Sequence, residues 1–286
     1  MGGDFAAIGQ DHVSQKAFVA ADQAGGDQGC GKAHKGDLYQ RHHKEKRMTN
    51  PTAAMLVIGD EILSGRTLDS NSNHLATALT AAGIDLKEIR VVSDDRDAII
   101  DAVQALSSAY DSLFTSGGIG PTHDDITADS IAAAFDTHID VRDDARELLR
   151  AFYESSGREL NAARLRMARI PDGAALIDNP VSVAPGFTLR NVHVLAGVPS
   201  VFKAMVASVI STLTKGAPLI SRSLRVVRGE GDIAGPLGIL ADQFSDLSFG
   251  SYPFQDDGIY GANVVVRGAD TARVDAAYAA LQSTFP

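Results

Sequence analysis

Residues 115–127 read Thr-Ser-Gly-Gly-Ile-Gly-Pro-Thr-His-Asp-Asp-Ile-Thr and hold the residue types best suited to chemistry. The three glycines, Gly117, Gly118 and Gly120, let the backbone turn with positive φ and bring its N–H groups close to an anion. Asp124 and Asp125 follow at the expected start of a helix, where carboxylates can hold a hard cation. Together these features point to phosphoanhydride chemistry. The alternative is a strand-to-helix turn that needs glycine for its geometry and aspartate as a cap.

The apolar spacing around this segment predicts alternating strands and helices. Strands are expected at 53–58, 86–92 and 112–115, with helices at 71–82, after 95 and at 127–135. Leu75, Ala78, Leu79 and Ala82 form one helical stripe, and Ile99, Ala102, Val103 and Leu106 form another. Alternation of this kind predicts an α/β fold with a doubly wound, mostly parallel sheet.

Two further acids follow the expected strands. Asp60 comes after the first strand and Asp94 after the second. Because loops that follow parallel strands open at one carboxyl edge, we expect both acids to lie near the glycine loop, where such folds bind ligands. Each also has a plain interpretation, Asp94 as the N-cap of the next helix and Asp60 as a turn former.

The remainder of the chain predicts two more regions. Residues 140–170 indicate two helices, with Leu148, Leu149 and Phe152 on one face of the first. Arg164, Arg166 and Arg169 are expected in the second helix, either to meet a substrate phosphate or as a solvated face. Strands at 187–190 and 192–195 then lead through Gly197 into a helix at 201–213. After Gly216 a βαββα order predicts a small α+β unit.

Composition narrows the functional classes. A formal net charge of −10 without a clustered basic face argues against a nucleic-acid partner. The single cysteine, Cys30, cannot form an internal disulfide, and no apolar run is long enough for a membrane span, so a cytoplasmic protein without a membrane partner is expected. Residues 1–47 lack apolar periodicity and stand before Met48, so we interpret them as a disordered extension outside the fold.

Four segments together resemble the molybdopterin-binding domain shared by MoaB, MogA, the N-terminal half of CinA and the N-terminal domain of eukaryotic FAD synthase. They are Gly59–Gly65 with Asp69-Ser-Asn71, Val92–Asp95, Ser116–Thr127 and Asn179–Gly186. The sequence is most similar to the CinA and FAD synthase branch over residues 48–216. The resemblance implies a three-layer MoaB/Mog-like domain at 48–219 and a small α+β domain at 220–286.

The resemblance also implies roles for individual residues. Asp94 and Asp125 match the acids used for catalysis and metal binding, and Asp124 is added to the expected metal ligands. The expected phosphate- and nucleotide-binding residues are Gly59, Asp60, Gly117, Gly118, Gly120, Thr122, Thr127, Asn179, Ser182 and Gly197. Ala196 departs from the family, which usually has proline in this closing loop.

The implied function is metal-dependent hydrolysis of a nucleotide pyrophosphate such as ADP-ribose or FAD. Molybdopterin binding or adenylylation in molybdenum cofactor biosynthesis, and a non-catalytic nucleotide-binding module, are the alternatives. The expected cofactor is a divalent ion, Mg²⁺ or a transition metal, with molybdopterin as a possible ligand. The expected partners are a nucleotide or pterin and further copies of the chain, in a dimer or trimer.

Overall fold

The computed structural model describes residues 50–286, and the expectation for residues 1–47 lies outside them. A six-stranded sheet has the order β2-β1-β3-β8-β7-β6. Its first four strands are parallel, and β7 and β6 run antiparallel to them. The strands are β1 (Thr52–Ile58), β2 (Asp85–Val92), β3 (Ser112–Ser116), β6 (Ala175–Ile177), β7 (Gly186–Leu189) and β8 (Val192–Leu195).

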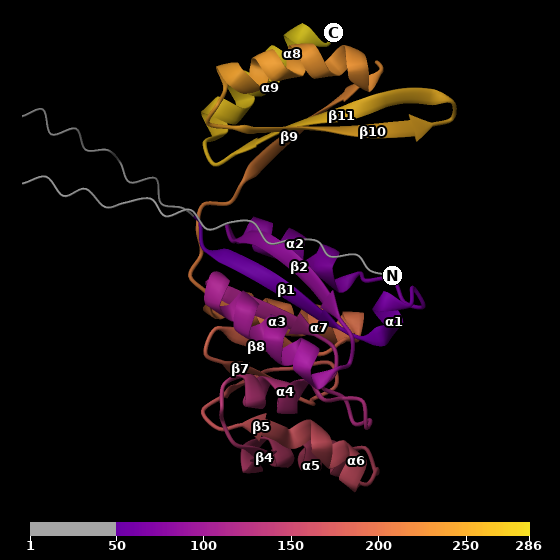
Figure 1. Ribbon diagram of the computed structural model, residues 1–286, viewed down its shortest axis with the longest axis vertical. Coiled ribbons are helices and arrows are strands. Elements are labelled where there is room, and N and C mark those ends of the chain that lie inside the picture. The colour runs from indigo at the N-terminus through magenta and orange to yellow at the C-terminus, as the bar shows by residue number, and fades with distance from the viewer. Residues whose placement is uncertain (1–49) are drawn as a thin grey trace, which may run out of the picture. The chain divides into compact units, whose positions relative to one another are not determined.

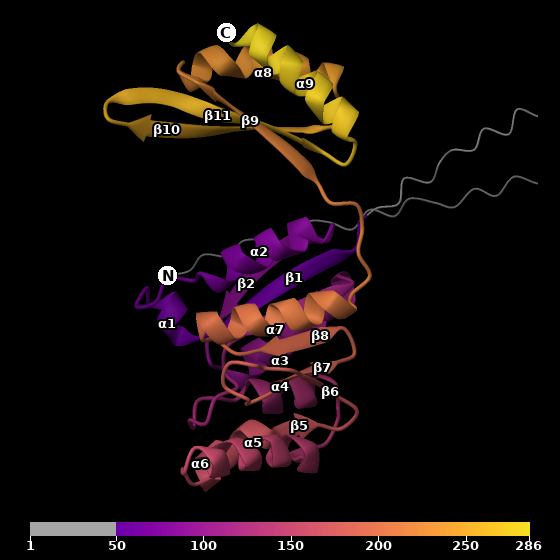
Figure 2. The ribbon, with the colours of Figure 1, turned by 180° about the vertical axis from the view of Figure 1, so that it is seen from behind.

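Helices cover both faces of this sheet, as the opposite views in Figures 1 and 2 show. The helices α3 (Arg96–Ala109) and α4 (Thr127–Ala134) lie on one face, and α2 (Asn71–Ala81) and α7 (Pro199–Thr212) on the other. Side chains of β1 alternate between the two cores: Ala54, Leu56 and Ile58 pack with α3 and α4, and Ala53, Met55 and Val57 with α2 and α7. The predicted three-layer, mostly parallel fold is confirmed.

The predicted helical stripes are largely buried. Leu75 and Leu79 of α2 are fully buried, and Gly83 follows the helix with a φ of 70°, which suits a glycine at a helix end. On α3 all four predicted core residues are buried. The helix begins at Asp95, whose side chain accepts a hydrogen bond from the N–H of Ala98. The cap is therefore Asp95, and Asp94 is left for another role.

Two local expectations need correction. The loop expected at Asp60 forms a one-turn helix, α1 (Asp60–Leu63), closed by a bond from the N–H of Ser64 to the carbonyl of Asp60. Residues 139–171 contain α5 (Asp143–Ser155) and only one turn of the second helix, α6 (Ala162–Leu165), followed by a 3₁₀ turn. The second helix ends early because Arg169–Pro171 pairs with Ile139–Val141 as strands β5 and β4. On α5, Leu149 is buried, but Leu148 is 44% exposed.

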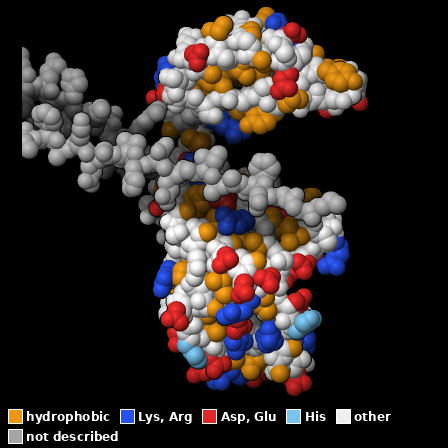
Figure 3. Space-filling model, viewed as in Figure 1, with side chains coloured by type: hydrophobic (Ala, Val, Ile, Leu, Met, Phe, Trp, Pro, Cys, Tyr) orange, Lys and Arg blue, Asp and Glu red, His pale blue; other side chains and the backbone are white. Residues whose placement is uncertain are grey.

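The C-terminal unit has the predicted βαββα order. Its antiparallel sheet, β10-β11-β9, and two helices enclose a separate core that includes Ile233, Val264 and Leu281. The elements are β9 (Ile220–Val226), α8 (Glu230–Gln243), β10 (Ser248–Asp256), β11 (Ile259–Gly268) and α9 (Thr271–Thr284). On the face shown in Figure 3, basic and acidic side chains are interspersed. Between residues 50 and 286, none of the helices combines the length and apolarity needed to cross a membrane.

Candidate functional site

The ends of four parallel strands lie level with one another at the carboxyl edge of the large sheet. Ile58 pairs with Val92, and Ser116 pairs with Leu195. Two bonds continue this register into the loops, from the N–H of Gly59 to Val92 and from the N–H of Gly117 to Leu195. The loops after β1, β2, β3 and β8 therefore leave the sheet together, as the sequence predicts.

The glycine loop turns sharply where β3 ends. Gly117 and Gly118 have φ angles of 109° and 69°, which side chains other than hydrogen rarely allow. A Cβ atom at Gly117 would collide with the carbonyl of Ile58, and one at Gly118 with the hydroxyl of Thr127. Both glycines are thus required by contacts within the protein, whatever the loop binds.

Thr127 holds this loop to the start of α4. Its hydroxyl donates to the carbonyl of Gly117 at 3.0 Å, and its N–H donates to the carbonyl of Gly118 at 3.0 Å. Its side chain is fully buried. Thr127 therefore fastens the loop from the inside, and its predicted contact with a ligand stays a prediction.

Three consecutive N–H groups of the loop have no partner. Those of Gly118, Ile119 and Gly120 find no acceptor within residues 50–286. The same residues line a cavity of about 470 Å³. Adjacent unpaired N–H groups on residues that line one cavity are suited to bind an anion such as phosphate.

The cavity gathers seven of the predicted site residues: Gly117, Gly118, Gly120, Asp125, Asn179, Ser182 and Gly197. Val198 and Val201, at the beginning of α7, close another side. That helix starts with a proline and has no side-chain cap, so its first N–H groups remain unsatisfied at its positive end. Gly59, Asp60, Asp94, Thr122, Asp124 and Thr127 do not line the cavity.

Asp125 lines the cavity but turns its carboxylate onto its own loop. Oδ2 accepts from the N–H of Thr122 at 2.8 Å and from the Thr122 hydroxyl at 2.5 Å. A Cβ atom at Gly120 would lie 2.7 Å from the same oxygen. The α4 helix has Ile126 at its N-cap without a side-chain bond, so Asp125 is not its cap. Asp125 and Thr122 instead form a clasp within the glycine loop.

Asp94 lies half-buried among other acids. Its Oδ2 accepts from the N–H of Asp60 at 3.0 Å. Burial, and to a smaller extent the charges of Asp60, Glu61 and Asp124, raise the pKa of Asp94 above its usual range. Asp125 is not among these neighbours, so Asp124 replaces it as the loop acid within electrostatic reach of Asp94.

The segment after β6 is organised by Asn179, which is 3% exposed. Its Nδ2 donates to the Ser182 hydroxyl and the Ala184 carbonyl, and its Oδ1 accepts from the N–H groups of Val181 and Ser182. Val183 has a φ of 68°, an unfavourable conformation for a β-branched residue. The amide of Asn179 therefore shapes the wall of the cavity and has no bond left for a ligand.

The three predicted arginines separate. Arg164 stacks on Tyr153, and Arg169 pairs with Asp129. Arg166 alone reaches the glycine loop, where it donates to the carbonyl of Asp125 at 3.2 Å. Its Nε is buried without a partner within the described part of the chain.

Glu61 and Met167 are among the cavity-lining residues that were not predicted as part of the site. Glu61 lines the cavity, and its carboxylate lies over Gly59, where a Cβ atom would sit 2.5 Å from it. Its place directly after Asp60 at the end of a strand was a usable signal. Met167 lines the cavity through the early end of α6, which the helical pattern concealed.

A metal ion near Asp94 would need water and substrate oxygens to complete its coordination. In residues 50–286 no group of three His, Cys, Asp or Glu side chains is placed to hold a metal. Mg²⁺ commonly takes one or two carboxylates, several waters and the phosphates of its substrate. A positive ion near Asp94 would also offset the repulsion among Asp60, Glu61 and Asp124.

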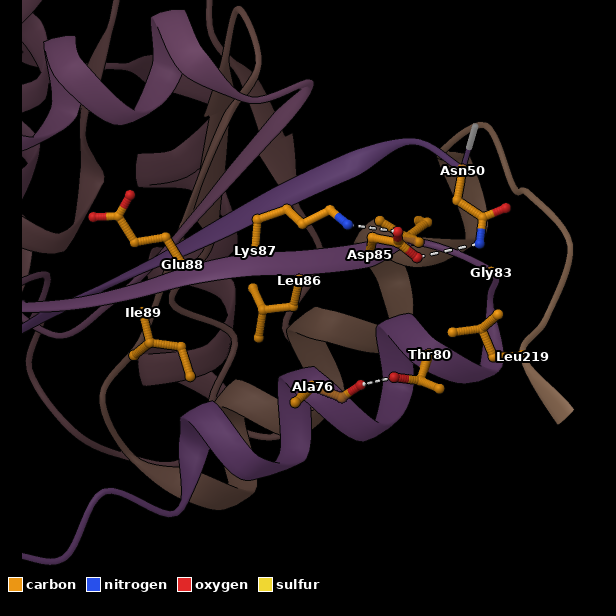
Figure 4. A pocket seen from close by; sticks show the side chains of 11 residues that line it. Asn50, Ala76, Thr80, Gly83, Asp85, Leu86, Lys87, Glu88, Ile89 and Leu219 are labelled. Atoms are coloured by element: carbon orange, nitrogen blue, oxygen red, sulfur yellow. Dashed lines mark hydrogen bonds and ion pairs between the residues drawn. The ribbon is translucent and has the colours of Figure 1, made fainter. Parts of the chain in front are cut away.

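Another cavity, of about 520 Å³, lies along the outer strand β2 and the end of α2 (Figure 4). Its polar groups are already paired: Lys87 with Asp85 at 2.8 Å, and Asn50 with Asp85 at 3.2 Å. None of the predicted site residues lines it. We therefore assign the chemistry to the smaller cavity at the glycine loop.

A family model described as the probable molybdopterin binding domain matches residues 54–215. The chain belongs to this molybdopterin-binding domain family. A second model, the middle domain of FAD synthase, matches residues 218–286. Both agree with the resemblance drawn from the four sequence segments, which is confirmed.

Individual relatives support the CinA-like branch. The chain is 34% identical over 174 residues to a protein from Metallosphaera sedula, covering 59% of this chain and 66% of that protein. It is 36% identical over 161 residues to a CinA-like protein from Citrifermentans bemidjiense, and the match covers 55% of this chain and 39% of that protein. The protein CinA, of unknown function, from Thermoplasma acidophilum has a crystal structure that matches with a TM-score of 0.53 and 32% sequence identity. The match covers 57% of this chain and 98% of that chain. The chain thus spans two thirds or less of the two curated proteins.

Proposed function

We propose that this chain hydrolyses a nucleotide pyrophosphate of the ADP-ribose or FAD type. The observation that carries the proposal is the row of three unpaired N–H groups, at Gly118, Ile119 and Gly120, on a cavity large enough for a nucleotide fragment. These donors match the non-bridging oxygens of a phosphate group. The acids at the same sheet edge suit the activation of water.

In this proposal a water oxygen attacks one phosphorus atom and forms a new P–O bond. The bond from that phosphorus to the bridging oxygen breaks, and the bridging oxygen leaves with the second phosphate. The N–H groups of the glycine loop stabilise the charge that grows on the attacked phosphate. Asp94 orients the attacking water, whose proton passes to solvent. ADP-ribose would give AMP and ribose 5-phosphate, and FAD would give AMP and FMN.

Asp94 and Asp124 would hold a divalent ion together with waters and substrate oxygens, since no three acidic side chains of residues 50–286 are placed to hold one by themselves. When bound, the ion would neutralise phosphate charge and polarise the phosphorus for attack. The oxygen-only ligands favour Mg²⁺ or Mn²⁺ over zinc.

Membership of the molybdopterin-binding family favours a second candidate, the binding of molybdopterin or its adenylylation. In that reaction a pterin phosphate oxygen attacks the α-phosphorus of ATP, and pyrophosphate leaves. A non-catalytic module that binds nucleotide in the same cavity is the third candidate. We also expect a cytoplasmic homo-oligomer, a dimer or trimer, which sedimentation would test.

The deciding experiment is to incubate the protein with Mg²⁺ and, separately, ADP-ribose, FAD or ATP, and to look for AMP. Release of AMP from ADP-ribose or FAD supports the hydrolase. Pyrophosphate released from ATP only when molybdopterin is added would favour adenylylation. Nucleotides that raise the melting temperature without forming product would indicate the binding module and overturn the hydrolase.

A further inference from the structure

A small recess with both apolar and polar lining residues adjoins the main cavity. Its volume is about 60 Å³, and it lies between the end of β1, the start of α2 and the start of the glycine loop. It shares Glu61, Gly117 and Gly197 with the main cavity. A ligand whose phosphate lies on the glycine loop could therefore extend a neighbouring group into the recess.

Asn71 lines this recess and holds a hydrogen-bond acceptor in a fixed orientation. The residue is 6% exposed. Its Nδ2 donates to the Ser116 hydroxyl and to the Gly197 carbonyl, both at 2.8 Å. Because a carbonyl can only accept, the amide cannot be flipped, and Oδ1 must face the other way. Oδ1 is buried and has no partner among residues 50–286.

Ser116 supplies the matching donor. Its side chain is 3% exposed, and its oxygen already accepts from Asn71. The hydroxyl hydrogen is then free to donate. The two neighbouring residues Asn71 and Ser116, which both line the recess, therefore hold one unpaired acceptor and one donor, and Glu61 on the shared wall is an additional acidic residue.

Size and polarity together select the occupant. A water molecule takes about 30 Å³ of liquid, so a recess of about 60 Å³ holds roughly two waters and excludes a purine or pterin ring. A hydroxyl both donates and accepts one hydrogen bond, which fits Asn71 Oδ1 and the Ser116 O–H. Carboxylates also serve as acceptors for ribose hydroxyls in other nucleotide sites.

We infer that Asn71 and Ser116 form a subsite for one ribose hydroxyl, so that the protein binds a nucleotide that carries this hydroxyl more tightly than an analogue that lacks it. The inference rests on the proposed nucleotide-binding function of the main cavity. It assigns the phosphate to the glycine loop and the sugar edge to the recess, and leaves the base to the larger space.

The test measures binding rather than turnover, by calorimetry with AMP, 2′-deoxy-AMP and 3′-deoxy-AMP. We expect the wild type to bind AMP about 10-fold or more tightly than the analogue that lacks the recognised hydroxyl, because a buried pair of groups is left unmatched. In Ser116→Ala the ratio should fall below about 3-fold. The matched control is Ser130→Ala, which removes a fully buried hydroxyl on α4 outside both cavities and should keep the wild-type ratio.

Ser116→Thr is a second test in case Ser116→Ala does not fold, because it keeps the hydroxyl for Asn71 and fills the recess with a methyl group. AMP should then bind more weakly, while the discriminated analogue should be little affected. Equal binding of all three nucleotides by the wild type, absence of AMP binding, or discrimination that survives in Ser116→Ala would overturn the inference. Hydrolysis of ADP-ribose without hydroxyl discrimination would overturn the subsite alone. Discrimination without hydrolysis would overturn the hydrolase alone.

Discussion

The clasp between Asp125 and Thr122 allows the structural and chemical roles of Asp125 to be separated. Asp125→Asn keeps an oxygen that can accept from Thr122 but removes the charge. Thr122→Val keeps the shape and the N–H bond but removes the hydroxyl bond. Each variant thus weakens the same clasp, and only the first removes a carboxylate from the cavity.

The expected loss of stability is small and similar in both variants. Hydrogen bonds to charged groups contribute about 1.5–3 kcal/mol and neutral ones about 0.5–1.5 kcal/mol, so Asp125→Asn should cost about 1 kcal/mol. Solvent around the exposed Thr122 makes this an upper value. Removal of the Thr122 hydroxyl should cost about 1 kcal/mol as well. In a protein of this size either change lowers the melting temperature by roughly 2–4 °C.

Turnover should distinguish the two variants. If the carboxylate of Asp125 acts on the cation or on the reacting phosphate, Asp125→Asn should lower kcat by a factor on the order of a hundred, as with other losses of transition-state electrostatics. Thr122→Val should stay within a few-fold of the wild type. The assay is Mg²⁺-dependent AMP release from ADP-ribose, with a thermal melt of each variant. Equal losses of kcat in both would refute a chemical role and leave Asp125 as a loop fastener.

Three further predictions follow from the charges and contacts of the large domain. Burial lowers the pKa of His193 to about 4, so below pH 6.5 the unfolded chain binds a proton that the folded chain does not. Between pH 7 and pH 4 the free energy of unfolding, measured by urea denaturation, should fall by about 3 kcal/mol more in the wild type than in His193→Gln. Parallel pH curves for the two proteins would contradict this. Glu61→Gln removes a negative neighbour and should lower the pKa of Asp94 in an NMR titration of its carboxyl group, whereas an unchanged value would exclude their coupling. Arg166→Met should lower kcat about 10-fold with little change in KM, because the loop loses its hydrogen bond at the Asp125 carbonyl. The control Arg164→Met changes a side chain that stacks on Tyr153 and should leave kcat unchanged. Equal effects of the two substitutions would show that Arg166 does not position the loop.

The sequence predicted the elements whose pattern reflects burial. Residues 53–58 of β1 are apolar throughout because both faces of the strand are covered by helices, and this pattern is typical of a central parallel strand. The topology in turn predicted that Asp60, Asp94 and the glycine loop would meet at one edge. The length predicted for the second helix of residues 140–170 was wrong, because Arg169–Pro171 pairs as a strand with Ile139–Val141. This partner lies about 30 residues away in the chain, and local periodicity carries no information about it.

The direction of individual side chains could not be predicted in the same way. Thr127 and Asn179 belong to the segments that carry the family resemblance. Both side chains nevertheless donate hydrogen bonds to backbone carbonyls of the loops that form the cavity wall. A motif records which residues a site requires, but it does not distinguish a residue that touches the ligand from one that holds the loop. Only the hydrogen-bond partners make that distinction.

Neighbouring aspartates make different contacts at this sheet edge. At the end of β2, Asp95 caps α3, which leaves Asp94 half-buried with its pKa raised. In the glycine loop, Asp125 closes the clasp with Thr122, and Asp124 is the residue within electrostatic reach of Asp94. In each pair one acid fixes the backbone of its own loop, and the other lies within electrostatic reach of further acids. The capping role that the sequence offered for Asp94 therefore belongs to its neighbour Asp95, whereas the chemical role of Asp94 stays a prediction.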